Sequence, residues 1–340
     1  MGFNKQLSVL IPVYNTEKYL RRCLDSVIDA LPENSEILII NDGSPDNAEI
    51  IIYEFLKKYP TLIRYFKKEN TGLADTKNYA LERAEGEFVI FLDSDDYVDK
   101  QIYTKLLSAA REQNATIAMC DIQLEYDDGR PPAVSGCCNT HRETPFSQAI
   151  DVPLMAASCN MIVHKSIHDG LPFPRGMNNE DIAVTPVLYW RAKNIAFVQE
   201  PLYFYVQRAG SIQNISFGEH RSVIIDTTHL CIERLNEAST EDIEMVKGSI
   251  YAHQILAIIL HPMRKLKFIT RYRTLKAYLR KAETLLPDLF SNRYVLEYKN
   301  NNTFLWRIFM RTTFFLMEYR QYFLTCITMS IANLKSRSTW

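Results

Sequence analysis

The chain has few glycines, and the glycine-rich phosphate-binding motifs of two large nucleotide-binding classes are missing. It has 11 glycines in 340 residues, and neither GxGxxG nor GxxxxGKS occurs. Both motifs need closely spaced glycines, which let the backbone approach a phosphate group. The sequence therefore argues against a Rossmann dinucleotide site and against a P-loop.

The cysteine pattern provides neither a zinc motif nor a disulfide framework. The seven cysteines include the adjacent pair Cys137 and Cys138, but none has CxxC spacing. Free thiols without such spacing are typical of a reducing compartment.

An excess of positive charge and a membrane-spanning run are also missing. The 39 lysines and arginines balance 40 acids, which argues against a nucleic-acid partner. No run reaches the ~18 apolar residues that a spanning helix needs. The first residues, MGFNKQLSVLIPVYN, suit a buried strand better than a signal peptide. We expect a cytoplasmic protein.

The first 120 residues alternate strand and helix patterns, which predicts an α/β fold with a doubly wound, mostly parallel sheet. Between the strands, residues 16–31 show helical spacing of apolar side chains, with Asn15 or Thr16 as N-cap. Residues 125–150 are rich in turn formers and predict a loop. Five short apolar runs have strand length: LSVLIPV, EILIIND, LIRYFKK, EFVIFLD and TIAMCDI.

Two of these predicted strands end in acids. Asp42 closes one strand, and Asp93, Asp95 and Asp96 follow another. Ligands of open α/β sheets bind at the carboxyl ends of the strands. These acids are therefore the first candidates for a binding site.

The segment FLDSDDYVD, residues 91–99, predicts a metal site. Carboxylates so close together repel one another, and a hard divalent cation relieves that repulsion. Oxygen ligands favour magnesium, manganese or calcium over zinc. An EF-hand is excluded because Val98 stands where its invariant glycine would be. The alternative is an acidic helix N-terminus that complements the helix dipole.

Asp42, in ILIINDGSPDN, could accept a hydrogen bond from a nucleotide base or a ribose hydroxyl, as acids at strand ends do in nucleotide sites. The alternative is an ordinary turn in which Asp and Gly have their usual conformational roles.

Taken together, the motifs resemble the inverting family 2 glycosyltransferases of GT-A fold, of the bacterial cell-surface polysaccharide type. The resemblance covers about residues 6–215 and implies a metal-dependent transferase. It rests on SVLIPVYN, NDGS, NTGLADTKNYALERAEGEFVIFLDSDD, CNMIVHKSIHDGLPFP, the pair Glu180 and Asp181, and EPLYFYVQRAGSI.

The resemblance also implies residue roles. Asp181 would be the general base, with Glu180 as its competitor. Asp95 would hold Mn²⁺ or Mg²⁺ at the diphosphate of the donor. Lys77 replaces the usual arginine of the family, so its bidentate contacts are lost. The donor-binding residues implied are Pro12 and Tyr14 at the base, Asp42 on the base, Asp93 on the ribose, Ser94 beside it, Lys77, and Arg208 near the diphosphate.

The reaction itself needs two separate carboxylates. One positions a cation that offsets charge on the leaving diphosphate, and the other takes the proton of the acceptor hydroxyl. Asp95 and Asp181 supply this minimum. The donor would be a UDP-sugar, and the acceptor a saccharide or lipid-linked saccharide. The competing hypotheses are a nucleotidyltransferase on the same sheet type and a non-catalytic glycan-binding relative.

The resemblance, together with the helical pattern that follows it, implies two regions. Residues 1–217 form the GT-A domain, with a nucleotide-sugar half at about 1–100 and an acceptor half at about 101–217. Residues 218–340 form a helical C-terminal extension. Basic residues in 261–282, and aromatics beside arginines in 304–324, predict a peripheral contact with an anionic membrane surface. The alternative is a helical core or a homodimer contact.

Overall fold

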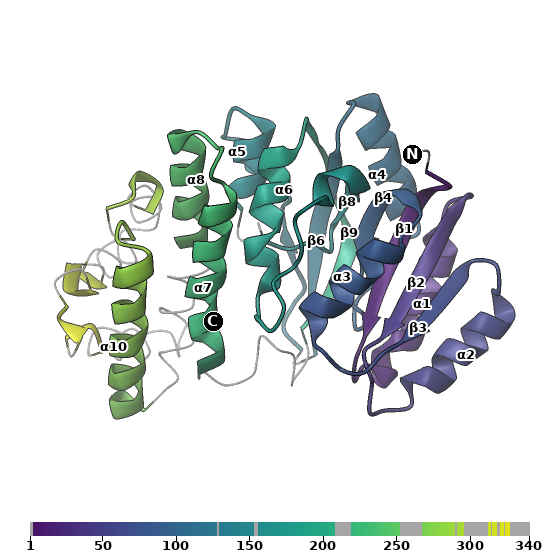
Figure 1. Ribbon diagram of the computed structural model, residues 1–340, viewed down its shortest axis with the longest axis horizontal. Helices are drawn as coiled ribbons and strands as arrows, with labels where there is room; N and C mark the ends of the chain where they lie inside the picture. The colour runs from purple at the N-terminus through teal and green to yellow at the C-terminus, as the bar shows by residue number, and fades with distance from the viewer. Residues whose placement is uncertain are drawn as a thin grey trace. The chain divides into compact units, whose positions relative to one another are not determined.

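The structure is a computed structural model of the 340-residue chain. It describes residues 3–127, 129–152, 156–207, 219–251, 267–289 and 291–295, together with parts of 312–326. The chain divides into two compact units, Met1–Ile215 and Ser216–Trp340. Each unit is described by itself (Figure 1).

The first unit is built on one nine-stranded sheet with the order β3-β2-β1-β4-β8-β6-β9-β5, and with β7 paired to β6. The pairing directions make six strands run one way and β5, β7 and β8 run against them. The mostly parallel α/β sheet expected from the sequence is therefore confirmed. The strands are β1 (Lys5–Val13), β2 (Ser35–Asn41), β3 (Ile63–Lys67), β4 (Gly86–Phe91), β5 (Tyr97–Val98), β6 (Ile117–Tyr126), β7 (Ala133–Ser135), β8 (Met161–His164) and β9 (Ile195–Gln207).

Strand β1 lies at the centre of the parallel part. Val9 is opposite Ile37 of β2 on one side and opposite Ile90 of β4 on the other. Both faces of β1 are apolar and fully buried, since Val9 and Leu10 have no exposed surface. Such strands need helices on both faces.

Helices supply that cover. On one face, Leu20 and Leu24 of α1 share an apolar cluster with Val9 of β1. On the sheet's other side α3 contacts β1 and β2, and Figure 1 shows it in front of the strands. The helices of this unit are α1 (Glu17–Ala30), α2 (Ala48–Lys58), α3 (Leu73–Arg83), α4 (Ile102–Glu112), α5 (Pro145–Ile150) and α6 (Thr185–Arg191), with 3-10 turns η1 (Lys165–His168) and η2 (Glu180–Ala183).

Helix α1 begins next to the predicted N-cap, but its cap is unusual. The Thr16 side chain makes no capping hydrogen bond. Its hydroxyl instead pairs with Ser94 Oγ at 2.8 Å. The backbone N–H of Glu17 donates to the Asp46 carboxylate at 2.7 Å. A residue distant in sequence therefore satisfies a free N–H of the first turn.

The predicted loop 125–150 is only partly correct. Strand β6 continues to Tyr126, β7 pairs with it, and α5 occupies residues 145–150. A capping box starts α5: Thr144 accepts from the N–H of Ser147, whose hydroxyl accepts from the N–H of Thr144. Serine takes the place of the usual Glu or Gln, and this hid the helix start in the sequence.

The described part of the second unit is helical, as the sequence predicts. It contains α7 (Glu219–Arg234), α8 (Thr240–Ile250) and α10 (Phe268–Leu285), and α7 contacts both of the others. Among the described residues, no helix combines the length and apolarity that crossing a bilayer requires. Segment 304–324 lies largely outside the described residues, so its membrane or dimer contact stays a prediction.

A close backbone approach at Gly86 sets the pairing of β4 with β1, and β4 leads to the acidic loop. A Cβ at this position would lie 2.5 Å from the backbone N of Ser8 and 2.7 Å from the carbonyl O of Phe88. Backbone atoms cannot rotate away, so Gly86→Ala should lower the free energy of unfolding by about 1 to 3 kcal/mol. Urea denaturation measures the change.

Gly136→Ala is the matched control, since the nearest atom to its added Cβ is 3.8 Å away. We expect a change within about 0.5 kcal/mol there. Equal stability of the two variants would contradict the tight approach at Gly86.

Candidate active site

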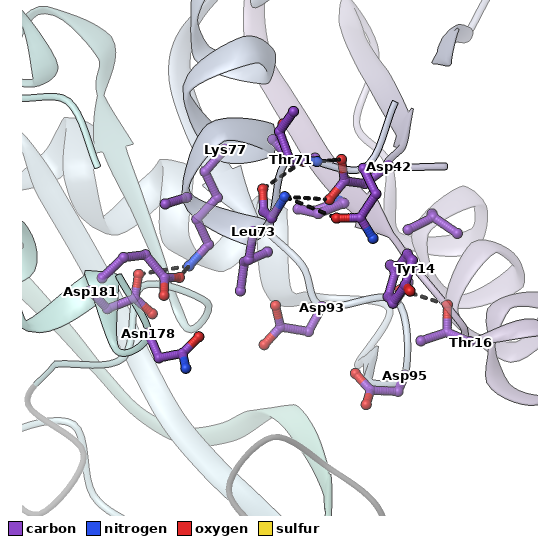
Figure 2. A pocket seen from close by; sticks show the side chains of 18 of the residues that line it. Tyr14, Thr16, Asp42, Thr71, Leu73, Lys77, Asp93, Asp95, Asn178 and Asp181 are labelled. Carbon is purple, nitrogen blue, oxygen red and sulfur yellow. Dashed lines mark hydrogen bonds and ion pairs between the residues drawn. The ribbon is translucent and has the colours of Figure 1, made fainter. Parts of the chain in front are cut away.

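A cavity of about 470 Å³ opens where β1, β2 and β4 end. This volume falls within the usual range for small-molecule sites. Figure 2 shows Asp42 and Tyr14 on one side, Lys77 and Asp181 on the other, and Asp93 between them. The lining residues used below are Pro12, Tyr14, Thr16, Asp42, Asn70, Thr71, Gly72, Lys77, Asp93, Ser94, Asp95, Met177, Asn178, Asn179, Glu180, Asp181 and Tyr205.

Asp42 already holds a loop of the cavity. Its two carboxylate oxygens accept from the backbone N–H groups of Thr71 and Gly72, each at 3.1 Å. The Lys68 ammonium also donates to this carboxylate. Asp42 is buried. A carboxylate has about four acceptor positions, so capacity remains for one more donor.

Tyr14 provides the exposed aromatic surface at this end of the cavity. It follows β1 and is 48% exposed, whereas the strand before it is buried. Asn15, the next residue, has a left-handed backbone with φ of 54°. The chain therefore turns sharply after Tyr14, and its ring lines the cavity beside Pro12. A planar base could stack there.

The acidic loop after β4 divides into two parts. Asp93, Ser94 and Asp95 line the cavity. Burial raises the pKa of Asp93 to about 7; nearby Lys77 opposes the rise, and the neighbouring carboxylates of Asp95 and Asp181 add to it. Ser94 is buried against Thr16 and keeps the loop close to α1.

Asp96 does not share this role, although the sequence groups it with the other acids. It is fully buried and is not among the lining residues. Its carboxylate accepts from the Tyr203 hydroxyl at 2.6 Å and from the Val206 N–H at 2.8 Å. Asp96 therefore anchors β9 to the acidic loop, which is a structural task.

Lys77, Glu180 and Asp181 form a buried charge cluster at the opposite end. The Lys77 ammonium donates to Asp181 Oδ1 at 2.6 Å and to Glu180 Oε1 at 2.8 Å. Ser158 Oγ donates to the same Asp181 oxygen at 3.1 Å. Lys77, expected among the donor-binding residues, thus lines the cavity with its charge already paired to two acids.

Asp181 has the electrostatic character of a proton acceptor. Burial raises its pKa to about 6; Lys77 opposes the rise, and Glu180 adds to it. Its side chain keeps 26% of its surface exposed, against 7% for Glu180. A carboxyl group with a pKa near neutrality is suited to general-base work. Of the two acids, Asp181 is the more accessible.

The donor set of the cavity fits a metal bound together with a diphosphate. Among the described residues, no group of three or more His, Cys, Asp or Glu side chains is arranged to hold an ion. Mg²⁺ is typically held by one or two carboxylates plus substrate phosphates, without a full protein cage. Asp95, with its carboxylate at the cavity, could provide such a ligand.

The cavity brings together all but one of the site residues predicted from the sequence. Arg208 lies outside the described residues. The prediction missed the loop at Asn70 and Thr71, the turn at 177–179, and Tyr205. The NTG triplet before α3 and the left-handed Asn179 (φ of 58°) are the features that mark the first two.

Solved structures share this fold. TarS 1–349 of S. aureus, in complex with UDP-GlcNAc, matches with a TM-score of 0.74 and 18% identity over 97% of this chain and 92% of that one. The mannosyltransferase PcManGT of Pyrobaculum calidifontis, with GDP-Man and Mn²⁺, matches with a TM-score of 0.51, 13% identity and 98% and 87% coverage. These likenesses confirm the GT-A fold expected from the sequence.

The sequence comparison identifies a family for the first part of the chain. Residues 8–170, just under half of the chain, match the model of glycosyl transferase family 2. The minor teichoic acid biosynthesis protein GgaB of Bacillus subtilis (strain 168) is 31% identical over 219 residues, covering 62% of this chain and 24% of GgaB. The putative glycosyltransferase EpsH of the same organism is 31% identical over 215 residues, covering 61% of this chain and 62% of EpsH. The chain thus spans about a quarter of GgaB and less than two thirds of EpsH.

The anchoring role of Asp96 is testable through its partner. Tyr203→Phe removes one buried donor to the carboxylate and should lower the free energy of unfolding by about 1 to 3 kcal/mol. Tyr53→Phe, at a tyrosine that is 57% exposed, is the matched control and should change it by less than about 0.5 kcal/mol. Urea denaturation that finds equal losses would contradict the anchor.

Proposed function

We propose that the protein is a metal-dependent, inverting glycosyltransferase that moves a sugar from a nucleoside diphosphate, preferably UDP, to a saccharide or lipid-linked saccharide. One observation carries the proposal: a single cavity has an aromatic ring and Asp42 at one end, Asp181 at the other end and Asp93 between them, and Asp95 also lines it. This arrangement suits a nucleotide base at the aromatic end, a diphosphate at the acidic loop and an acceptor hydroxyl beside Asp181.

The relatives support the substrate classes. TarS, of the same fold, is solved with UDP-GlcNAc, and GgaB is named for minor teichoic acid biosynthesis. We therefore infer a UDP-sugar donor and an acceptor from cell-surface polymer synthesis. The family match favours glycosyl transfer over nucleotidyl transfer.

Each end of the cavity has its own task in this proposal. The Tyr14 ring stacks on the base while Asp42 accepts its N–H, and Asp93 accepts from the ribose. Asp181 takes the proton of the acceptor hydroxyl as that oxygen attacks the anomeric carbon. Attack from the face opposite the leaving diphosphate inverts the configuration at that carbon. A divalent ion held by Asp95 and the diphosphate would offset the charge that builds up on the leaving oxygens.

Donor binding should depend on Asp95 and on a divalent cation. A panel of nucleotide sugars with Mn²⁺, scored by donor hydrolysis, identifies the donor. Isothermal titration with that donor should then show binding that is lost in EDTA and in Asp95→Ala, because the diphosphate loses its counter-charge. Asp99→Ala, a change in a half-buried acid outside the cavity lining, is the control and should bind normally. Unchanged donor affinity in EDTA would overturn the metal-dependent part of the proposal.

Asp181 should matter for turnover far more than for donor binding. Asn keeps the shape of the side chain but takes no proton, so Asp181→Asn should lower kcat by about 10² to 10⁴. Donor affinity should stay within a few-fold of wild type, since the base acts on the acceptor.

Glu180→Gln is the matched comparison and should be the milder change. If Glu180→Gln loses turnover and Asp181→Asn does not, the base is Glu180. If neither variant loses turnover, the general-base mechanism is wrong for this protein.

A further inference from the structure

Lys77 is one of the most buried charged groups of the chain. It lies on α3 and is 2% exposed, and both of its acidic partners come from the turn η2, more than 100 residues later. Its ammonium also lies 5.0 Å from the centre of the Phe173 ring and 5.5 Å from that of Phe91. No water reaches such a group freely, so its charge must be balanced by protein atoms.

The neighbouring residue ties α3 to the same segment. The Asn78 side chain donates to the carbonyl of Phe173 at 2.9 Å and accepts from its N–H at 2.8 Å. Two successive residues of α3 thus hold the start and the end of segment 173–181. Asn78 does so through neutral hydrogen bonds, whereas Lys77 does so through charge.

The cluster is rich in negative charge. Glu180 comes from the same turn as Asp181, and Asp93 faces both from the loop after β4. The thiol of Cys159 and the hydroxyl of Tyr189 from α6 interact electrostatically with Asp181. The Lys77 ammonium interacts electrostatically with all three acids. Without it, two adjacent carboxylates and Asp93 would repel one another in a buried site.

We propose that Lys77 is a positioning residue: its buried ammonium holds the carboxylates of Glu180 and Asp181 and provides the counter-charge that keeps Asp181 ionised and aimed into the cavity. The inference rests on the proposed function in treating Asp181 as the base. It adds that the charge of Lys77 acts on Asp181. The family resemblance had instead placed Lys77 among the residues that bind the donor.

The charge role has a titration consequence. Lys77 lowers the pKa of Asp181, which burial and Glu180 raise to about 6. Removal of the ammonium should therefore move this midpoint to higher pH, because the ionised form loses its main stabilising partner. Below its midpoint Asp181 is protonated and cannot accept a proton. The acid limb of kcat should therefore also move to higher pH.

The first experiment needs no substrate. In protein labelled with ¹³C at the aspartate carboxyl carbons, the Asp181 signal is the one missing from Asp181→Asn. We expect its midpoint near pH 6 in wild type and at least one pH unit higher in Lys77→Met, which keeps the length of the side chain. Asn78→Ala is the matched control: it loosens the same segment without removing charge, so its midpoint should stay within about half a unit of wild type. An unchanged midpoint in Lys77→Met would overturn the proposal.

Glu180→Gln keeps the proposal testable should Lys77→Met fail to fold. This variant retains the ammonium and removes the like charge, so the Asp181 midpoint should fall below the wild-type value. An unchanged or higher midpoint would show that these three groups do not share their charge, and would equally overturn the proposal.

The pH dependence of kcat distinguishes a positioning role of Lys77 from a purely structural one. At pH 6.5, Lys77→Met should lose at least about three-fold in kcat and regain most of it at pH 8.5, while Lys77→Arg should stay within about two-fold of wild type. A loss that is equal at both pH values would assign Lys77 a purely structural role. If the wild-type protein turned over no nucleotide sugar, the proposed function would fail, and the carboxyl titration would still decide the charge role of Lys77.

Discussion

The parallel pairing of β1 with β2 and β4 is the constraint on which the site depends. Because these strands run the same way, the chain leaves all three at one edge of the sheet. Tyr14, Asp42 and Asp93 follow the ends of these strands and therefore meet at one cavity. A slip of one strand by one residue would turn every side chain, including those at the strand end, to the opposite face of the sheet. The sheet core and the site geometry are thus set by the same interactions.

Buried charged side chains also hold the site together. The Asp96 carboxylate points away from the cavity and accepts hydrogen bonds from Tyr203 and from the backbone of Val206, which ties the acidic loop to β9. Lys77 ties α3 to η2 in a similar way. A buried ion pair contributes little net stability compared with apolar packing, but the loss of one partner is costly. These contacts therefore fix which segments meet, and they leave Asp181 more accessible than its neighbour Glu180.

Sequence reasoning succeeded where the signal is local. Apolar runs that end in acids predicted β2 and β4, and the carboxyl-end rule placed Asp42 and Asp93 at one edge. It failed where the outcome depends on distant partners. Nothing in the spacing of DSDD tells that Asp96 points away from the cavity, because Tyr203 lies 107 residues further on. Lys77 is a similar case, since its acidic partners follow about 100 residues later. The short strands β5, β7 and β8 have too few residues to show a period.

Helix α3 links the two ends of the cavity. Its N-cap is Gly72, and the N–H of Gly72 donates to the Asp42 carboxylate. Lys77 lies five residues further along the helix. A helix rises 1.5 Å per residue, so the two positions are about 7.5 Å apart along the axis. Hydrogen bonds hold this spacing far more stiffly than a loop would. Helix α3 therefore contacts both the carboxylate on the base side and the carboxylate at the acceptor end. A shift of α3 would therefore move the Thr71–Gly72 loop and the Lys77 ammonium, which is the counter-charge to Asp181, together.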